Sequence, residues 1–273
     1  MYDFHYHRPV TLAEASALIA DCRDGVYLAG GQTLIATLKQ RLARPSDVVD
    51  LGAIDGLAGI TLRGGVIEIG AMTLHADVAA SEDVRKAIPA LGALAAMIGD
   101  PQVRNRGTIG GSLATNDPAA DYPAAVLALA ATIHTDRRDI AADDFFRDLF
   151  ETALAPGEII TKVSFPLPER AGYAKFPNPA SRYAMVGVMV GVMAADLGGG
   201  VRVAVTGAGA CVFRQPDMEA ALSKSFTAAA IEAIVVSDED FNDDIHGSAE
   251  YRAHLVTVMA KRAVDAADCG PRP

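Results

Sequence analysis

Two glycine-rich turns hold the residue types best suited to chemistry in this chain. The first turn consists of Ala29, Gly30, Gly31, Gln32, Thr33 and Leu34. Paired glycines between a strand and a helix can present unblocked backbone N–H groups, which suit a pyrophosphate. The same pair is equally typical of a plain tight turn. The turn matches neither GxGxxG nor the Walker lysine spacing, so a nicotinamide Rossmann site or a P-loop has little support.

The second turn consists of Thr108, Ile109, Gly110, Gly111 and Ser112. Its first and last residues add hydroxyl groups, and Asp121 follows as an acceptor suited to a ribose or ribityl hydroxyl. A polar surface turn with a capping aspartate is the alternative interpretation. Two such turns in consecutive α/β units, facing each other across a cleft, would fit an extended diphosphate ligand.

Histidine and cysteine spacing indicates neither a metal centre nor a nucleophile. The six histidines show no metal-ligand spacing, and Cys22, Cys211 and Cys269 form no CxxC pair. We interpret the cysteines as small buried apolar residues. Because no Ser-His-Asp or Cys-His pattern is evident either, we predict no catalytic residues and no metal site.

The length and charge of the chain exclude several classes of function. Its 273 residues, 51% of them hydrophobic, suffice for one large domain or two small ones. The net charge of −10 and the absence of a basic stripe argue against nucleic acid and anionic membranes. The start lacks the features of a signal peptide, and the longest apolar stretch, 184–195, is shorter than the roughly 20 residues of a membrane span. We therefore predict a soluble, cytoplasmic protein.

Apolar spacing and turn residues predict two small α/β units followed by a different pattern. Thr11 is the expected cap of the first helix, with Glu14 as its capping-box partner. In the first unit we predict a strand at 26–29, a helix at 34–42 and a strand at 48–51. In the second we predict a hairpin at 59–62 and 66–70, helices at 74–80, 89–98 and 123–130, and a strand at 131–134.

A linker is expected at 166–170, where two prolines interrupt the pattern. Beyond it we predict long strands at 185–195 and 201–206, joined by three glycines at 198–200. Helices at 218–222, 227–235 and 249–266 then close the chain. Strands followed by helices favour an α+β domain with an antiparallel sheet.

At its two glycine turns the chain resembles the flavoprotein subunits of the xanthine dehydrogenase family, especially the medium subunit of aerobic carbon monoxide dehydrogenase. The matching stretches are FHYHRP at 4–9 with LAEA at 12–15, AGGQTLIATLKQRLARPSDVVDL at 29–51, PQVRNRGTIGGSLATNDPAADYPA at 101–124, GEII at 157–160 and HGSAEYRAHLV at 246–256. The resemblance covers nearly the whole chain in order, and the AGGQ and TIGG pair at this spacing is highly specific.

This resemblance implies an α+β fold in two domains. Residues 1–167 would form a two-lobed FAD-binding domain of the vanillyl-alcohol oxidase type, with lobes at about 1–55 and 56–167. Residues 168–273 would form a smaller α+β domain of the carbon monoxide dehydrogenase type, with an antiparallel sheet and helices.

The resemblance also implies the cofactor site. In the family the two turns hold the FAD diphosphate, so Ala29 to Thr33, with the adjoining Leu34, and Thr108 to Ser112 inherit that role. Asp121 falls on a further FAD contact. Ile160, Lys175 and Tyr183 match family contacts near the flavin, although residue types alone favour a solvated lysine and a core tyrosine.

The partners follow from the resemblance as well. Such subunits pair with a small iron–sulfur subunit and a large molybdopterin subunit, as a dimer of heterotrimers. The substrate is oxidised at molybdenum, and electrons pass through the clusters to FAD and on to an external acceptor. A self-contained FAD-dependent oxidase or reductase is the alternative enzyme, and a flavin-binding scaffold without electron transfer is the alternative non-enzyme.

Overall fold

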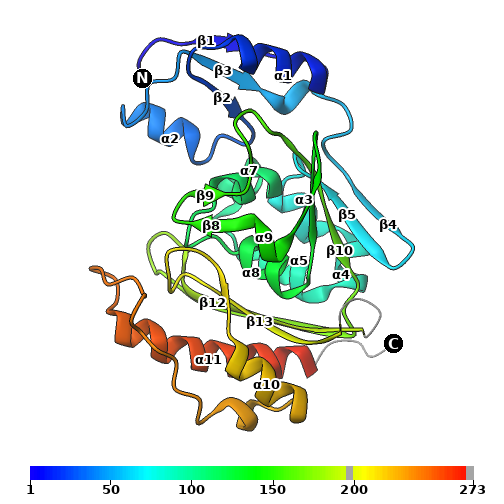
Figure 1. Ribbon diagram of the computed structural model, residues 1–273, viewed down its shortest axis with the longest axis vertical. Helices are drawn as coiled ribbons and strands as arrows, with labels where there is room; N and C mark the ends of the chain where they lie inside the picture. Colours follow the sequence, from blue (N-terminus) through cyan, green and yellow to red (C-terminus); the bar gives the residue numbers. More distant parts are fainter. Residues whose placement is uncertain (195–198, 269–273) are drawn as a thin grey trace.

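The N-terminal lobe is a small parallel sheet with a helix on either side, at the top of the computed structural model in Figure 1, which describes residues 1–194 and 199–268. Its elements are β1 (His5–His7), α1 (Leu12–Asp21), β2 (Gly25–Leu28), α2 (Leu34–Lys39), β3 (Asp47–Asp50) and the 3-10 turn η1 (Leu51–Ala53). The strand order is β1-β3-β2, with both pairings parallel. Strand β1 was not predicted, because its three residues are too few to show a period.

The predicted cap of α1 is confirmed. The Thr11 hydroxyl accepts a hydrogen bond from the Glu14 amide at 3.2 Å. The Glu14 carboxylate accepts from the Val10 amide at 2.9 Å, one residue before the position that a capping box requires. Thr11 therefore caps the helix, Glu14 holds the residue just before the cap, and Ala15 is turned into the small core of this lobe.

The second lobe is built on a five-stranded antiparallel sheet of order β4-β5-β10-β6-β7. These strands are β4 (Ile60–Arg63), β5 (Val66–Gly70), β6 (Thr132–Thr135), β7 (Asp139–Ala141) and β10 (Ile160–Pro166). The predicted hairpin is confirmed as β4 and β5. The central strand β10 was missed, because it follows the hairpin by some ninety residues and only the tertiary fold pairs the two.

Short helices fill the space beside this sheet (Figure 1). They are α3 (His75–Ala80), α4 (Glu82–Ala87), α5 (Pro89–Ala96), α6 (Pro101–Arg104), α7 (Ile109–Thr115), α8 (Tyr122–Ala128) and α9 (Ala142–Phe145), with the small hairpin β8 (Phe146–Asp148) and β9 (Glu151–Thr152). The helices predicted at 74–80, 89–98 and 123–130 correspond to α3, α5 and α8. Helices α4 and α6 were not predicted.

The C-terminal part is a four-stranded antiparallel sheet of order β11-β12-β13-β14. Its elements are β11 (Arg170–Pro177), β12 (Ala184–Met193), β13 (Gly200–Thr206), β14 (Phe213–Arg214), α10 (Pro216–Lys224), the 3-10 helix η3 (Ala228–Ile231) and α11 (Ala249–Asp268). The predicted linker at 166–170 overlaps the ends of β10 and β11. The helix predicted at 227–235 is wrong beyond the short η3. The predicted strand end at Ala195 and the glycine at 198 lie outside the described residues.

Strand β12 is apolar along its whole length because both of its faces are covered. Val186, Val188 and Val190 belong to the core under α11, whereas Met189 and Met193 belong to the core of the second lobe. The helices approach closely at two glycine positions: a Cβ on Gly172 would lie 2.0 Å from the Ala263 carbonyl of α11, and one on Gly191 would lie 2.8 Å from the Ala128 carbonyl of α8. The sheet is therefore clamped between α8 and α11 (Figure 1).

Candidate functional site

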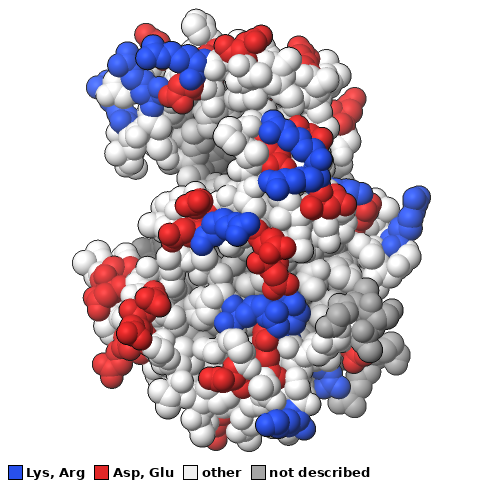
Figure 2. All heavy atoms as spheres, in the orientation of Figure 1, with Lys and Arg blue, Asp and Glu red and all other residues white. Residues whose placement is uncertain are grey.

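The two glycine turns line one cleft of about 600 Å³. This volume lies within the range of about 300 to 1,000 Å³ that is usual for ligand pockets. The first turn comes from the N-terminal lobe and the second from the lobe below it. Figure 2 shows the surface notched between these two parts of the molecule. The facing arrangement predicted from the sequence is therefore present.

The first turn leaves backbone amides free. Gly31 has φ +74°, and the α2 helix then starts with the Ile35 amide donating to the Gly31 carbonyl at 3.0 Å. Within residues 1–194 and 199–268, the amides of Gly31, Gln32 and Thr33 have no hydrogen-bond acceptor. These three donors stand at the rim of the cleft, as the sequence predicted.

The second turn differs, because its amides are already satisfied. The bonds run from Ile109 to the Thr73 carbonyl at 3.2 Å, from Gly110 to the Ala71 carbonyl at 2.8 Å, from Gly111 to the Thr108 hydroxyl at 3.1 Å and from Ser112 to the Thr108 carbonyl at 3.0 Å. The amides from Ile109 to Ser112 are therefore not free to bind a ligand, in contrast to those of the first turn. Thr108, Gly110, Gly111 and Ser112 of this turn line the cleft, and Gly111 has no side chain to keep a ligand from its backbone.

The two turns touch each other through Gly30. A Cβ at this position would lie 2.1 Å from the Arg106 carbonyl, just ahead of the second turn. Across the same gap, a Cβ on Gly111 would lie 3.4 Å from the Ala29 side chain. Glycine at these positions thus lets the two lobes close to backbone contact.

Most of the predicted site residues line the cleft. These are Ala29, Gly30, Gly31, Gln32, Thr33, Leu34, Thr108, Gly110, Gly111, Ser112, Asp121, Ile160 and Tyr183. The structure does not bring Ile109 or Lys175 to the cleft wall. Ile109 is completely buried in the core of the second lobe. Lys175 lies behind Asp121, away from the cleft surface.

Asp121 is held by a buried ion pair. Its Oδ1 accepts from the Tyr173 hydroxyl at 2.6 Å and lies 2.8 Å from the Lys175 ammonium, which also donates to the Met97 carbonyl at 2.9 Å. The pKa of Asp121 is raised, because complete burial outweighs the opposing influence of Lys175 and Tyr173. The Lys175 side chain is 2% exposed, so the solvated lysine that its residue type favours is wrong. Lys175 acts on the cleft only by fixing Asp121.

Tyr183 stands at the edge of the cleft with 48% of its surface exposed, so it is not a core tyrosine. A tight turn carries it there. The Asn178 carboxamide accepts from the amides of Ala180 and Ser181 at 2.9 and 3.1 Å, and Arg182 has φ +63°. The exposed ring thus lines the same cleft as the glycine turns, where a planar ligand could stack on it.

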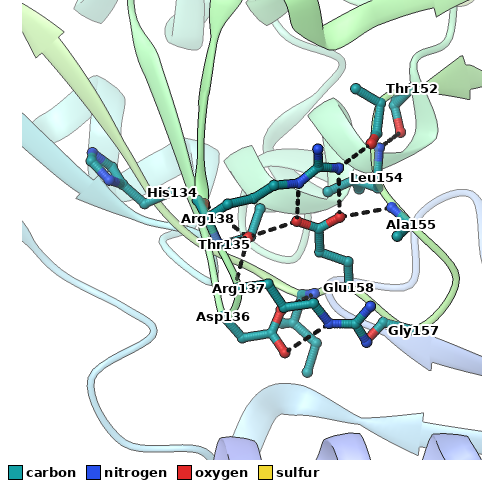
Figure 3. A network of polar contacts seen from close by, with 12 residues as sticks. His134, Thr135, Asp136, Arg137, Arg138, Thr152, Leu154, Ala155, Gly157 and Glu158 are labelled. Carbon is teal, nitrogen blue, oxygen red and sulfur yellow. Dashed lines mark hydrogen bonds and ion pairs between the residues drawn. The ribbon is translucent and has the colours of Figure 1, made fainter.

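A network of polar contacts fixes the segment that ends in Ile160 (Figure 3). The buried Glu158 carboxylate accepts from Arg138 Nε and Nη2 at 3.0 Å each, from the Thr135 hydroxyl at 2.8 Å and from the Ala155 amide at 2.7 Å. The hydrogen bonds from Arg138 and these other donors lower the pKa of Glu158 to about 2. The carboxylate is therefore ionised at neutral pH and holds the 155–160 loop against the cleft.

The same loop joins the N-terminal lobe to the second lobe. The Gly157 carbonyl accepts from the Tyr27 hydroxyl of β2 at 3.3 Å and from Arg137 Nη2 at 2.8 Å. The Asp136 carboxylate accepts from the Ile159 amide at 2.8 Å and from the Ser16 hydroxyl of α1 at 3.3 Å. The width of the cleft is thus set by polar contacts that the sequence did not reveal.

His75 is a cleft residue that sequence reasoning missed. It is 5% exposed, its ring lies 5.3 Å from that of Tyr122, and its amide donates to the Gly107 carbonyl at 2.9 Å. Burial lowers the pKa of His75 to about 4, so the ring is neutral at pH 7. Its Nδ1 has no partner among the described residues. The sequence Thr-Leu-His at 73–75, which ends in the first residue of α3, carries no signal that would single out His75 as a cleft residue.

The cysteines are less buried than expected. Cys22 and Cys211 are free and half-buried, and Cys269 lies outside the described residues. Among residues 1–194 and 199–268, no helix is both long and apolar enough to cross a membrane.

Comparison with known families decides the class of protein. Residues 2–168 match the family described as the FAD binding domain in molybdopterin dehydrogenase, and residues 171–267 match the CO dehydrogenase flavoprotein C-terminal domain. The chain belongs to the FAD-binding subunits of molybdenum hydroxylases. The predicted family, α+β class, FAD cofactor and role as the flavoprotein subunit of an oxidoreductase are thereby confirmed.

Individual members of this family align with the chain over almost their whole length. The chain is 38% identical to the nicotine 6-hydroxylase medium subunit of Paenarthrobacter nicotinovorans, covering 95% of each chain. It is 33% identical to the carbon monoxide dehydrogenase medium chain of Hydrogenophaga pseudoflava, covering 97% of this chain and 96% of the relative.

Solved structures of the family have the same fold. A carbon monoxide dehydrogenase from Hydrogenophaga pseudoflava superimposes with a TM-score of 0.88 at 34% identity, covering 97% of both chains. Quinoline 2-oxidoreductase from Pseudomonas putida 86 superimposes with a TM-score of 0.87 at 30% identity, covering 98% of both. The family subunits thus belong to multi-subunit enzymes, while the substrates in these names differ from one relative to the next.

Proposed function

We propose that the FAD diphosphate lies between the two glycine turns, bound by the free amides of Gly31, Gln32 and Thr33. The observation that carries this proposal is the pairing of three unsatisfied amides with the bare Cα of Gly111 across one cleft. Phosphate oxygens accept from such donors, and a glycine face allows the diphosphate to approach closely.

The remaining cleft residues then receive distinct roles. The Ser112 hydroxyl donates a hydrogen bond to the phosphate or ribityl chain, and the Asp121 carboxyl accepts one from a ribityl or ribose hydroxyl. Tyr183 stacks on the flavin ring, and Ile160 adds an apolar contact from the wall of the same cleft. Lys175 is assigned a positioning role, because it reaches Asp121 and not the cleft.

We further propose that the chain works as an electron relay in a larger enzyme. The bound flavin supplies electron transfer between a small iron–sulfur subunit and an external acceptor, while a large molybdopterin subunit oxidises the substrate. A dimer of such heterotrimers in the cytoplasm is the proposed setting. We also propose that the boundary between the FAD-binding domain and the C-terminal domain lies at 167/168. The family matches, which end at 168 and resume at 171, support this boundary.

Flavin analysis tests the first part of this proposal. Denaturing the purified holoprotein should release FAD, because only a dinucleotide has the diphosphate that the amides of 31–33 are proposed to bind. Release of FMN, or failure of the apoprotein to take up FAD, would contradict the proposed diphosphate site.

Reduction assays separate the relay from the self-contained oxidase. The isolated, flavin-loaded chain should be reduced by dithionite but not by an aldehyde, purine or N-heterocycle that reduces the full complex. It should also elute with its iron–sulfur and molybdopterin partners in size-exclusion chromatography. Turnover of such a substrate by the isolated chain, at the rate of the complex, would establish the oxidase instead.

A further inference from the structure

Four potential metal ligands gather at the edge of the N-terminal sheet, away from the cleft. A nitrogen of His7, the Cys22 sulfur and a carboxylate oxygen of Asp47 all lie within 4.8 Å of one another. His7 Nε2 is 2.7 Å from Asp47 Oδ1, and His5 Nδ1 is 3.7 Å from the same oxygen. Among the residues that the structure describes, this is the one group of three or more such side chains within metal-binding reach.

The fold itself brings these residues together. His5 and His7 are two apart on β1, so both side chains point to the same face of the strand. Asp47, the first residue of the central strand β3, pairs with His5 of β1 on one side and with Gly25 of β2 on the other. Cys22 is the C-terminal cap of α1, just before β2. It lies against the start of that strand, since a Cβ on Gly25 would be 2.8 Å from the Cys22 Cβ.

This group lies at the opposite end of the sheet from the cofactor turn. All three strands run parallel; His5 and Asp47 are the first residues of β1 and β3, Cys22 precedes β2, and His7 at the end of the short β1 reaches back to Asp47. The turn that begins at Ala29 follows the far end of β2. None of the four residues lines the cleft. The group is therefore separate from the FAD site.

We propose that His7, Cys22 and Asp47, with His5 as the fourth ligand, form a zinc site that ties β1 to the rest of the N-terminal lobe. Thiolate, imidazole and carboxylate are the ligands that Zn²⁺ takes in tetrahedral sites, with bonds of about 2.0 to 2.3 Å. Tetrahedral geometry with such bonds separates neighbouring ligand atoms by roughly 3.3 to 3.8 Å. The spacings among His7, Cys22 and Asp47 bracket this range, whereas the exposed His5 side chain lies outside that group and must turn further to reach the ion.

Binding has a defined proton balance. Without metal, the Cys22 thiol donates to the Leu18 carbonyl at 3.0 Å, so it carries its proton. Coordination replaces that proton with Zn²⁺, and the proton passes to solvent. The thiolate and the Asp47 carboxylate then neutralise the two positive charges of the ion, while both histidines bind as neutral rings.

A structural hydrogen bond accounts for only part of this arrangement. The contact between His7 and Asp47 could simply hold β1 against β3. It would require neither a thiol within reach of both side chains nor a second histidine at 3.7 Å from the same carboxylate. Cys211, the other half-buried cysteine, belongs to no such group and therefore provides a matched control.

Metal titration of the full-length, flavin-loaded chain tests the proposal. After treatment with a chelator, the protein should bind one equivalent of Zn²⁺ in competition with a chromophoric chelator. Co²⁺ should give the absorption of a tetrahedral site with a thiolate-to-metal band. Cys22→Ser should remove this band and weaken Zn²⁺ binding by roughly tenfold or more, whereas Cys211→Ser should leave both unchanged.

A second variant keeps the test valid if Cys22→Ser proves unstable. The His5 side chain is 84% exposed, so His5→Gln should fold normally yet also weaken Zn²⁺ binding by roughly tenfold. Zn²⁺ should raise the melting temperature of the wild-type chain and of Cys211→Ser by more than that of either site variant. Absence of stoichiometric binding, or equal binding by all variants, would overturn the proposal. Flavin content should stay the same throughout, so failure here leaves the FAD assignment untouched.

Discussion

The two glycine turns look alike in sequence but are built for different tasks. In the first turn, the amides of Gly31, Gln32 and Thr33 have no acceptor among the described residues. In the second, the amides from Ile109 to Ser112 bond to Ala71, Thr73 and Thr108. One turn therefore offers donors to a ligand, whereas the other offers a rigid surface against which the ligand can be held.

The difference comes from what lies behind each turn. The first connects β2 to α2 at the edge of a three-stranded lobe, so nothing on the cleft side competes for its amides. The second lies against the end of β5, where the carbonyls of Ala71 and Thr73 face it directly. A Gly-Gly pair is thus compatible with either role, and the surrounding backbone decides between them.

The largest effect is expected at Gly30, where the two turns meet. Gly30→Ala places a Cβ 2.1 Å from the Arg106 carbonyl, so the turns must separate and the cleft must widen. We expect FAD to bind at least about 100-fold more weakly, which corresponds to about 2.7 kcal/mol. Gly209→Ala is the control, because Gly209, like Gly30, lacks a positive φ, and a Cβ there would meet nothing closer than Phe213 at 3.6 Å. Fluorescence titration of the apoproteins measures the difference, and equal affinity for both variants would show that the turns need not touch.

Two neighbouring glycines of the second turn should fail in different ways. Gly110→Val drives a side chain into Ala71, 2.6 Å away, so it should lower the free energy of unfolding by about 3 kcal/mol through overpacking. Gly111→Val meets only the Thr108 hydroxyl at 3.0 Å and the Ala29 side chain at 3.4 Å.

For Gly111→Val we expect nearly normal stability with FAD affinity reduced by roughly 10- to 30-fold, or about 2 kcal/mol. Thermal melts of the apoproteins, set beside FAD titrations, separate the two outcomes. If Gly110→Val folded normally and lost only FAD, both glycines would face the ligand and the rigid-surface interpretation of this turn would be wrong.

Several features of the fold could be predicted because local signals sufficed. The cap at Thr11, the hairpin around Gly64 and Gly65, and the long apolar strand β12 each depend on neighbouring residues and on period. The glycine turns were found for the same reason, and the order of their motifs matched one family along the chain. All of the predicted site residues except Ile109 and Lys175 line the cleft, whereas Tyr27, His75 and Glu158 also line it and were not predicted.

What could not be predicted depends on contacts between distant residues. Strand β10 pairs with β5 across a long sequence separation, and Glu158 meets Arg138 only after that sheet has formed. Lysine is usually a surface residue, yet Lys175 is buried, because its ion pair with Asp121 offsets the cost of burying the charge. The amides of the second turn find their acceptors in Ala71 and Thr73, which no residue type or spacing could indicate.

The stability of the chain should also depend on pH through the second turn, because the buried His75 donates its amide to the Gly107 carbonyl just ahead of that turn. Burial lowers the pKa of His75 from 6.5 to about 4, so the unfolded chain takes up this proton first as the pH falls. Stability should therefore be lost between pH 6.5 and 4, by about 2 kcal/mol from pH 7 to pH 5. Urea melts of the apoprotein at both pH values measure the loss.

Two comparisons assign this pH effect to His75. In His75→Gln the difference in free energy of unfolding between pH 7 and pH 5 should be smaller by most of this loss of about 2 kcal/mol, whatever the variant's absolute stability. Glu158 contributes little to the change between pH 7 and pH 5. Its pKa is lowered from 4.5 to about 2, so the stability that its carboxylate provides is lost only as the pH falls below 4.5. An unchanged pH dependence in His75→Gln would mean that this ring is protonated in the folded chain.

The smallest effect should come from the hydroxyl groups of the two turns, and it should be unequal. The first turn is proposed to bind FAD through its backbone, so Thr33→Ala should change FAD affinity by no more than about twofold. In the second turn the amides are occupied, and the Ser112 side chain is the polar group left facing the cleft. Ser112→Ala should therefore weaken FAD binding about fivefold, as expected for one hydrogen bond of about 1 kcal/mol. The Thr33 side chain makes no capping hydrogen bond, and Ser112 lies inside α7, where alanine is well tolerated, so thermal melts of the apoproteins should stay close to the wild type. Titration of FAD into the two variants gives the result directly. A larger loss in Thr33→Ala than in Ser112→Ala would reverse the assignment of backbone binding to the first turn and side-chain binding to the second.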